Sequence, residues 1–353
     1  KRENKTTDTR LTNIINRKCW NIIWKNKTDS VINFSCTLNS EPLRFRVNNL
    51  WSGEIGTITG STRFGYLAGS SAKPDFQTGG IANTAFGFLA LYATVKGYGN
   101  TAMGHQSMLG NSSGCNNTSI GLNAMVYATT GNNNTAIGAG SIYSQNTGDN
   151  NTALGSLSLG ENLTGKNNTS IGYGTLKNNK IGSNNTVLGN LADVSKDGLS
   201  NATAIGNGSM VDENDKVVIG NSFVKVIGGN VAWSNLSDER FKYNLNLNVP
   251  GLKFINKLNP VTYIIDVNKL DEFTRTGVIS DGIYHYANNK NDNQRIHTGF
   301  LAQQVEKICK EIGYDFDGII VPSDKNGHYS LSYGQFVVPL VKAVQEQQLI
   351  IEA

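Results

Sequence analysis

The sequence has little charge, few cysteines and no long hydrophobic run. Charged residues make up 16% of its 353 positions, whereas glycine occurs 39 times. This balance is typical of an elongated β architecture with short turns and argues against a helical enzyme. The longest apolar run falls short of the roughly 18 residues that a membrane-spanning helix needs, so we expect no membrane span. The length leaves room for two or three domains.

Cysteine and histidine are too scattered to predict a metal site. Cys19, Cys36, Cys115 and Cys309 stand far apart without a Cys-x-x-Cys spacing, which argues against zinc. Isolated cysteines are more often buried thiols, although their spacing leaves disulfides open. The four histidines show no paired spacing either. We therefore expect neither a metal nor a cofactor.

The net charge of +4 comes from one end of the chain. Residues 1–50 hold ten Lys/Arg against four Asp/Glu, residues 51–236 nine against nine, and residues 237–353 twelve against fourteen. No basic face with interleaved aromatic residues is present, which argues against a nucleic-acid partner. The chain opens without methionine or a signal-like apolar core and stops within a helical pattern, so we expect an excised fragment.

A 17-residue repeat fills the middle of the chain. A segment of the form Asn-Thr-small-apolar-Gly recurs eight times at this spacing, once with Ala in place of Asn. A second line of small residues keeps the same spacing. The segments begin at Asn83, Asn100, Asn117, Asn134, Asn151, Asn168, Asn185 and Ala202, and the small residues are Ala90, Ser107, Ala124, Ser141, Ser158, Thr175, Ala192 and Ser209. Phe64-Gly65 resembles an earlier copy with a five-residue insertion, and Val218-Ile219-Gly220 a shortened last one.

A strict period of this length predicts stacked coils of two short strands and two turns. We expect the Phe/Met/Ile/Leu position to point inward, the small residues to lie where coils or subunits approach, and the Asn pairs to form ladders. The alternative is a disordered low-complexity tract, which the in-phase apolar positions disfavour. The unit resembles the left-handed parallel β-roll of trimeric autotransporter adhesin heads over residues 60–229. That resemblance implies a homotrimer, and many such heads bind host surface molecules.

The flanking parts differ in composition from the repeat. Residues 1–59 are expected to form a β-rich connector. There, Leu43, Phe45 and Val47 alternate with polar residues as in a strand, and Val31–Phe34 is a candidate partner. Residues 230–236 form a linker, and residues 237–353 read as a small α/β domain.

The expected elements of that domain are a helix over 250–258, a strand over 261–267, a polar loop or hairpin over 270–295, a helix over 301–312, strands at 319–321 and 329–331, and a helix from about 333. Leu301, Val305 and Ile308 are expected on one side of the 301–312 helix. The last helix carries apolar residues at near-heptad spacing, which fits a coiled coil or an amphipathic helix packed on its own domain.

Four motifs in this domain occur in a recognisable order. They are Ser237-Asp238-Glu239-Arg240-Phe241-Lys242, Leu258-Asn259-Pro260-Val261-Thr262-Tyr263, Thr298 to Glu306 (TGFLAQQVE), and Tyr329-Ser330-Leu331-Ser332-Tyr333. Alone, a Ser-x4-Lys pair more often marks a polar turn. Together the motifs resemble the intramolecular chaperone auto-processing domain that ends phage tailspikes, endosialidases and related fibres, and that also occurs in the myelin regulatory factor. One departure is Gln304, where the family commonly has Glu.

The resemblance implies self-cleavage between Leu236 and Ser237. In that reading Lys242 removes the Ser237 hydroxyl proton, the oxygen attacks the Leu236 carbonyl, and water hydrolyses the resulting ester. Asp238 and Arg240 are possible supporting residues. The chain would be a trimeric viral or bacterial surface fibre whose C-terminal domain drives trimerisation and then leaves. The alternative is a non-cleaving adhesin on a virion or cell surface that binds a host receptor or glycan. A glycan-degrading enzyme ranks lower, because the repeat offers no matched carboxylates.

Overall fold

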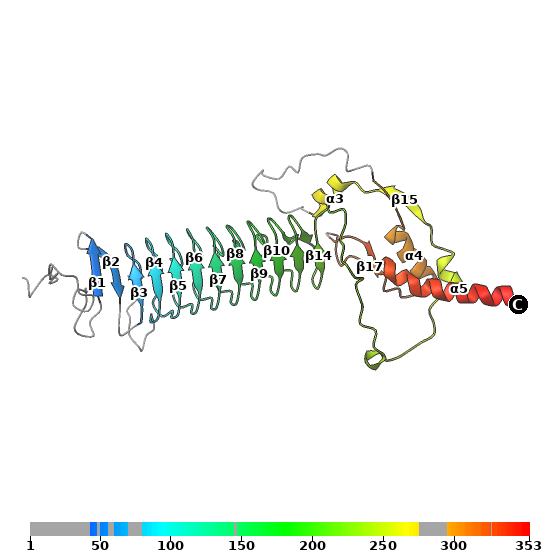
Figure 1. Cartoon of the computed structure of the whole chain (residues 1–353), viewed down its shortest axis with the longest axis horizontal. Helices are drawn as coiled ribbons and strands as arrows, with labels where there is room; N and C mark the ends of the chain where they lie inside the picture. Colours follow the sequence, from blue (N-terminus) through cyan, green and yellow to red (C-terminus); the bar gives the residue numbers. More distant parts are fainter. Residues whose placement is uncertain are drawn as a thin grey trace, which may run out of the picture.

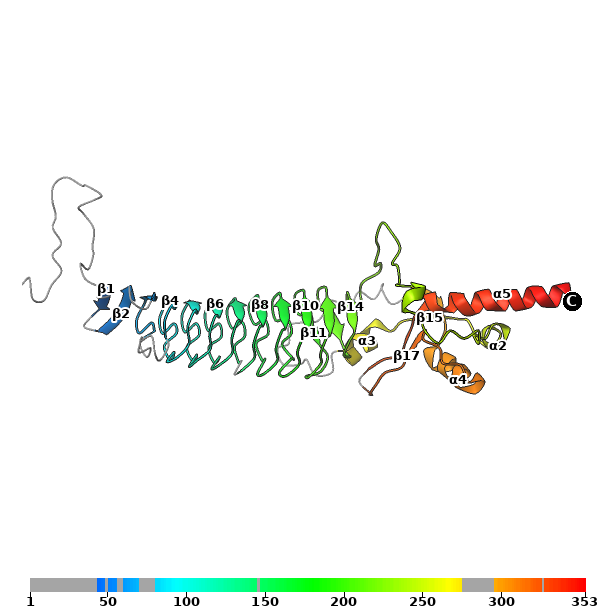
Figure 2. The same ribbon diagram turned by 90° about the horizontal axis from the view of Figure 1, so that it is seen from below.

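The computed structural model describes residues 43–47, 50–55, 60–69, 80–144, 147–274, 295–325 and 327–353. Figure 1 shows a straight stack of coils followed by a smaller region of helices and short strands, with helix α5 at the C-terminal tip. Figure 2 shows the same division from a second side. The expected pairing of Val31–Phe34 lies outside the described residues.

The strands of the stack are β1 (Leu43–Val47), β2 (Leu50–Ile55), β3 (Thr62–Phe64), β4 (Thr84–Phe86), β5 (Thr101–Met103), β6 (Thr118–Ile120), β7 (Thr135–Ile137), β8 (Thr152–Leu154), β9 (Thr169–Ile171), β10 (Thr186–Leu188), β11 (Asp193–Val194), β12 (Thr203–Ile205), β13 (Met210–Val211) and β14 (Val217–Ile219). From β3 to β14 one strand per coil joins a single parallel sheet, and β11 pairs with β13 in a second sheet. The predicted β-solenoid with 17-residue coils is therefore confirmed.

The two irregular copies also lie where the repeat predicts them. Thr62 in β3 pairs with Thr84 in β4, which is 22 positions further on and so contains the five-residue insertion. Thr203 in β12 pairs with Val217 in β14 only 14 positions on, so the last coil is three residues short. At the other end, β1 pairs antiparallel with β2, and β2 with β3, so a hairpin starts the stack.

The orientation predicted for the strands is wrong. From β3 to β12, each three-residue strand of the main sheet buries its middle residue, which is Ala, Ser, Val or, in β3, Arg, and leaves the third residue half-buried or exposed. Phe86 is 52% exposed, Met103 42% and Leu154 43%. Alternation along a strand puts neighbours on opposite faces, so a buried Ala forces the large apolar residue outward.

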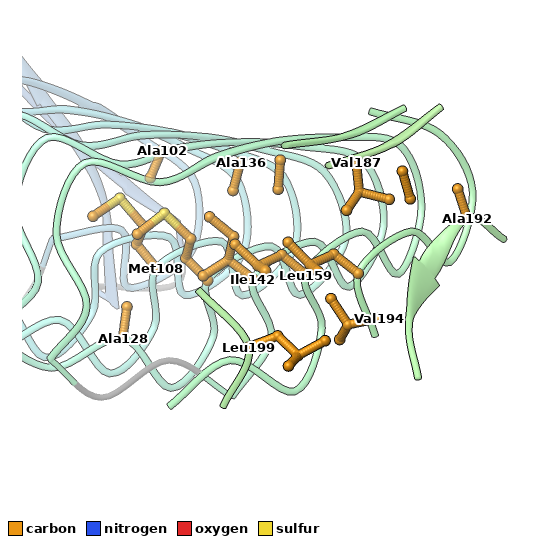
Figure 3. Packing of buried hydrophobic residues seen from close by; sticks show 14 of the residues in the cluster. Ala102, Met108, Ala128, Ala136, Ile142, Leu159, Val187, Ala192, Val194 and Leu199 are labelled. Atoms are coloured by element: carbon orange, nitrogen blue, oxygen red, sulfur yellow. The ribbon is translucent and has the colours of Figure 1, made fainter. Parts of the chain in front are cut away.

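The solenoid core comes from a different line of residues at the same spacing. Leu91, Met108, Met125, Ile142, Leu159 and Leu176 are fully buried and lie one above another along the stack. In Figure 3, Met108, Ile142 and Leu159 form a row, with the small strand residues Ala102 and Ala136 on the opposite wall. The line of small residues from Ala90 to Ser209 is buried as well, within the coils. A coil of 17 residues is narrow, and one large side chain per coil fills it.

The predicted asparagine ladder is confirmed. The Asn that opens each Asn-Thr segment is buried, and its side chain bonds to neighbouring coils. The Oδ1 of Asn117 accepts the backbone N–H of Asn134 at 2.8 Å, and its Nδ2 donates to the Gly131 carbonyl at 2.8 Å. The same two bonds recur from Asn83 to Asn185. The ladder thus satisfies backbone groups that the turns would otherwise leave buried without partners.

Asp193 breaks the line of apolar core residues. It stands 17 positions after Leu176, yet it is only 2% exposed. Its carboxylate accepts the N–H groups of Asn178 at 3.1 Å and Val194 at 2.7 Å. Burial raises its pKa from 3.8 to about 7, and these hydrogen bonds offset only part of that rise.

Because the folded-state pKa of Asp193 is raised, its stabilising contribution is complete below about pH 3.8 and is lost as the pH rises through 7. A rise of this size means that the folded state loses about 4 kcal/mol of stability when the pH is high enough to ionise this carboxylate. We expect Asp193→Asn to unfold at a higher temperature than wild type at pH 8 and to depend less on pH between 4 and 8. Thermal unfolding measures this, with the exposed Asp215→Asn as control. Equal pH dependence in Asp193→Asn and wild type would contradict it.

The C-terminal region contains η1 (Glu239–Phe241), α2 (Leu252–Ile255), β15 (Val261–Ile264), α3 (Val267–Thr274), β16 (Ile296–Gly299), α4 (Ala302–Ile312), β17 (Ile319–Ile320), β18 (Ser330–Leu331), η3 (Tyr333–Phe336) and α5 (Val337–Glu352). The small α/β region with a C-terminal helix is as predicted. Two details are corrected. First, helix α3 begins at Val267, the last residue of the expected strand, and extends into the expected loop. Second, Leu301 does not join the buried side of α4: it is 43% exposed just before the helix, whose buried residues are Ala302, Val305 and Cys309.

An aromatic cluster holds this region together. Phe254 of α2 is fully buried against Phe316 and Phe336, with ring centroids 5.1 and 6.2 Å apart. Helix α5 packs on α2, buries its Pro339 and Ala343, and accepts the Leu252 N–H at Glu346 at 2.8 Å. Most apolar residues of α5 point elsewhere and are exposed. They are Val337, Val338, Leu340, Val341, Val344, Leu349, Ile350 and Ile351. No helix among the described residues is long and apolar enough to cross a membrane.

Candidate active site

The predicted site lies on an extended arm, residues 230–248, between the solenoid and α2. Figure 1 shows this stretch looping away from both neighbouring parts of the chain. Every side chain on the arm is exposed except the half-buried Asp238. Its apolar residues include Trp233 at 85% exposure, Leu236 at 82% and Tyr243 at 91%. Such a segment leaves a large apolar surface uncovered in the single chain.

The short η1 turn brings Ser237 and Lys242 together. The backbone N–H of Phe241 bonds to the Asp238 carbonyl at 3.2 Å, and that of Lys242 to the Glu239 carbonyl at 3.0 Å. The chain therefore turns back on itself between the two residues, and Lys242 Nζ donates to Ser237 Oγ at 2.8 Å. This is the distance at which a base can take a hydroxyl proton.

Asp238 and Arg240 brace the turn between them. The Asp238 carboxylate accepts the Arg240 backbone N–H at 2.9 Å and its guanidinium at 2.6 Å, which lowers the pKa of the carboxylate. Arg240 also lies over the Phe241 ring, 5.8 Å from its centroid. In the single chain, these two residues therefore stabilise the turn that holds Ser237 and Lys242 together.

The arm lacks the desolvation that such a pair needs. A lysine is a base only when neutral, and its ordinary pKa near 10.4 keeps it charged in water. Both Ser237 and Lys242 are exposed. Leu236, whose carbonyl forms the peptide bond to Ser237, is exposed as well. The geometry of a Ser–Lys pair is present, whereas the dry environment is not.

One signal near the pair was missed at the level of sequence. Phe241, Tyr243, Leu245 and Leu247 alternate with Lys242, Asn244, Asn246 and Asn248, which is the period of a half-buried strand. All four apolar residues are at least 67% exposed, and Leu247 is fully exposed. The pattern thus predicts a surface that another element covers.

The described cysteines lie outside the arm and form no metal site. Cys115 and Cys309 are free thiols, Cys309 is buried, and burial raises its pKa. Cys19 and Cys36 lie outside the described residues. Within the described ranges, no three His, Cys, Asp or Glu side chains come together as metal ligands.

Two of the other motifs are joined in the fold. The Tyr333 hydroxyl accepts the Phe300 N–H at 3.0 Å, and the Tyr329 hydroxyl donates to Glu306 at 3.1 Å. The third and fourth motifs are therefore neighbours across the β16–α4 corner. Gln304, the departure from the family pattern, is exposed on α4.

Comparison with known families supports the resemblance over part of this region. Residues 237–314 match the model of the peptidase S74 family, described as chaperone of endosialidase. The match begins at Ser237 itself and ends just after α4. Searches of curated proteins and of solved structures gave no significant match. The chain therefore joins a β-solenoid to a C-terminal region similar to the chaperone of endosialidase family, a combination that fits a tailspike- or fibre-like protein.

Proposed function

We propose that this chain is a trimeric fibre protein of a virion or cell surface, whose C-terminal domain, residues 237–353, directs assembly and is then released by self-cleavage between Leu236 and Ser237. The observation that carries the proposal is the 2.8 Å contact of Lys242 Nζ with Ser237 Oγ at the first residue of the family match. Cleavage at this bond would separate the solenoid from the domain that follows it.

The chemical step uses only residues of the arm. Neutral Lys242 takes the Ser237 hydroxyl proton, and Oγ attacks the carbonyl carbon of Leu236. The C–N bond between Leu236 and Ser237 then breaks, and the protonated lysine returns its proton to the departing amine. The acyl group is now an ester on Oγ. Water hydrolyses that ester, which leaves a Leu236 carboxylate and restores the serine hydroxyl at a new N-terminus.

Three exposed apolar surfaces support assembly with further copies of the chain. One is the outward line of strand residues, such as Phe86, Met103 and Leu154. The second is the arm, and the third is the free face of α5. Monomeric soluble proteins rarely expose contiguous apolar surface of this extent. Packing of the arm between copies would also remove water from Lys242, which would tie cleavage to assembly.

The free face of α5 gives a direct test of the trimer. Val344 is 63% exposed in the single chain, so Val344→Asp leaves the fold of one subunit intact. In a coiled coil the same residue meets its copies, and three carboxylates there would repel one another. We expect Val344→Asp to be monomeric and uncleaved by native mass measurement, whereas Gln345→Asp stays like wild type. A trimer formed by Val344→Asp would contradict the role of α5.

The site of cleavage is tested by sequencing the N-terminus of the smaller fragment from purified protein. The proposal expects a fragment of about one third of the chain that begins at Ser237. A single full-length band would favour the non-cleaving adhesin. A fragment that begins elsewhere would point to an external protease.

A further inference from the structure

The tip of the β17–β18 hairpin reaches back to the last coils of the solenoid, as Figures 1 and 2 show. His328 Nδ1 lies 2.9 Å from Asp212 Oδ2, and Ser323 donates its backbone N–H to Glu213 Oε1 at 3.3 Å. Asp324 pairs with Lys196. The contact thus joins the C-terminal region to the solenoid through side chains more than 100 positions apart in sequence.

The contact is polar and includes one Lys–Asp ion pair. On the solenoid side, Asp212 faces His328, Glu213 faces the backbone N–H of Ser323, and Lys196 pairs with Asp324. Asp212 is only 3% exposed, and Lys216 holds its second oxygen at 2.8 Å. Close approach is required as well, because a Cβ on Gly327 would lie 2.7 Å from Glu213 Oε1.

The solenoid side of this contact exists only when the coils are stacked. Lys196 follows β11, and Asp212 and Glu213 follow β13, one coil later. Parallel pairing of β11 with β13 is what places the three side chains on one surface. An unfolded shaft would not present them together.

We propose that the hairpin tip is a latch that docks on the folded end of the solenoid, and that the latch, once the chain is cut, is the contact that decides whether the two fragments stay together. The second half of this inference rests on the proposed function, and the first half does not. Partly exposed ion pairs are individually weak. While the chain is intact, the arm keeps the latch at an effective concentration of about millimolar, so weak contacts suffice to close it.

The latch is tested first in uncleaved full-length protein carrying Ser237→Ala, by hydrogen exchange of residues 321–325 and 327–329. We expect Glu213→Ala or Asp212→Asn to speed exchange there by about three- to tenfold, because each variant removes one polar contact between the hairpin and the solenoid. About 1 M NaCl should do the same, because it screens the charges. Asp215→Asn, an exposed neighbour, is the matched control. Unchanged exchange in both variants and at high salt would overturn the latch.

A charge swap provides the specific check. Lys196→Glu and Asp324→Lys should each loosen the hairpin, and the double variant should restore its protection. In cleaved protein that keeps Ser237, the salt concentration needed to separate the two fragments on a sizing column should be lower for Glu213→Ala than for wild type, and unchanged for Asp215→Asn. Equal separation in both variants would overturn the role of the latch after cleavage. If no cleavage occurs at all, the proposed function fails, while the exchange measurement still decides the latch.

Discussion

Replacement of Lys242 by alanine is expected to abolish cleavage and leave a full-length chain. The lysine is the group within hydrogen-bond reach of the Ser237 hydroxyl, at 2.8 Å. A positioned acid–base group contributes a factor of about 10²–10⁴ to a rate. Without it, the processed fraction should fall from nearly all of the protein to an undetectable level on a denaturing gel.

Two further variants separate the lysine's chemistry from its position. Lys242→Arg keeps a cation and a donor but cannot lose its proton in a protein, so we expect no cleavage. Lys253→Ala removes an exposed lysine on α2, outside the arm, and should process like wild type. Normal cleavage of Lys242→Ala would refute the Ser–Lys pair even if the family resemblance stands.

Substitution of a glycine in the stacked turns should have the second largest effect, on stability. Gly121 has a φ of +140°, and a Cβ there would lie 2.6 Å from the Gly138 carbonyl oxygen. An L-residue rarely adopts this backbone conformation, and the neighbouring carbonyl is part of the rigid backbone, so neither can adjust without a large cost in free energy. We expect Gly121→Ala to cost about 3 kcal/mol or more and to lower the unfolding temperature markedly.

The matched control is Gly228→Ala, beyond the last coil. A Cβ at Gly228 meets only a side-chain atom of Val226 at 3.7 Å, so this change should leave the unfolding temperature nearly unaltered. Equal thermal unfolding of the two variants would mean that the glycine line does not set the spacing of the coils. The same comparison can be repeated at Gly155, where an added Cβ would clash with the Gly172 carbonyl oxygen.

The repeat predicted the solenoid but not which way its side chains face. A 17-residue period fixes which residues stack, and it says nothing about which of two neighbouring apolar lines is inside. The inner line, from Leu91 to Leu176, was visible as large apolar residues at the same spacing. The narrow coil decided the choice, because a buried Ala or Ser in the strand leaves room for only one large residue per coil.

The candidate site could be located from sequence, whereas its surroundings could not. The motif that begins at Ser237 predicted the pair, and its short turn explains why five residues of separation suffice. Exposure of the arm and the contact of His328 with Asp212 depend on how distant parts of the chain meet. Strand Val261–Ile264 likewise stops earlier than its apolar pattern suggested, because Val267 starts a helix.

The central claim is that assembled copies of this chain cut themselves at one bond. Native mass spectrometry of freshly purified protein tests it most directly, because it reports subunit number and fragment masses together. We predict trimeric species in which every chain is split between Leu236 and Ser237. Monomers of intact chain at all protein concentrations would contradict both the assembly and the cleavage.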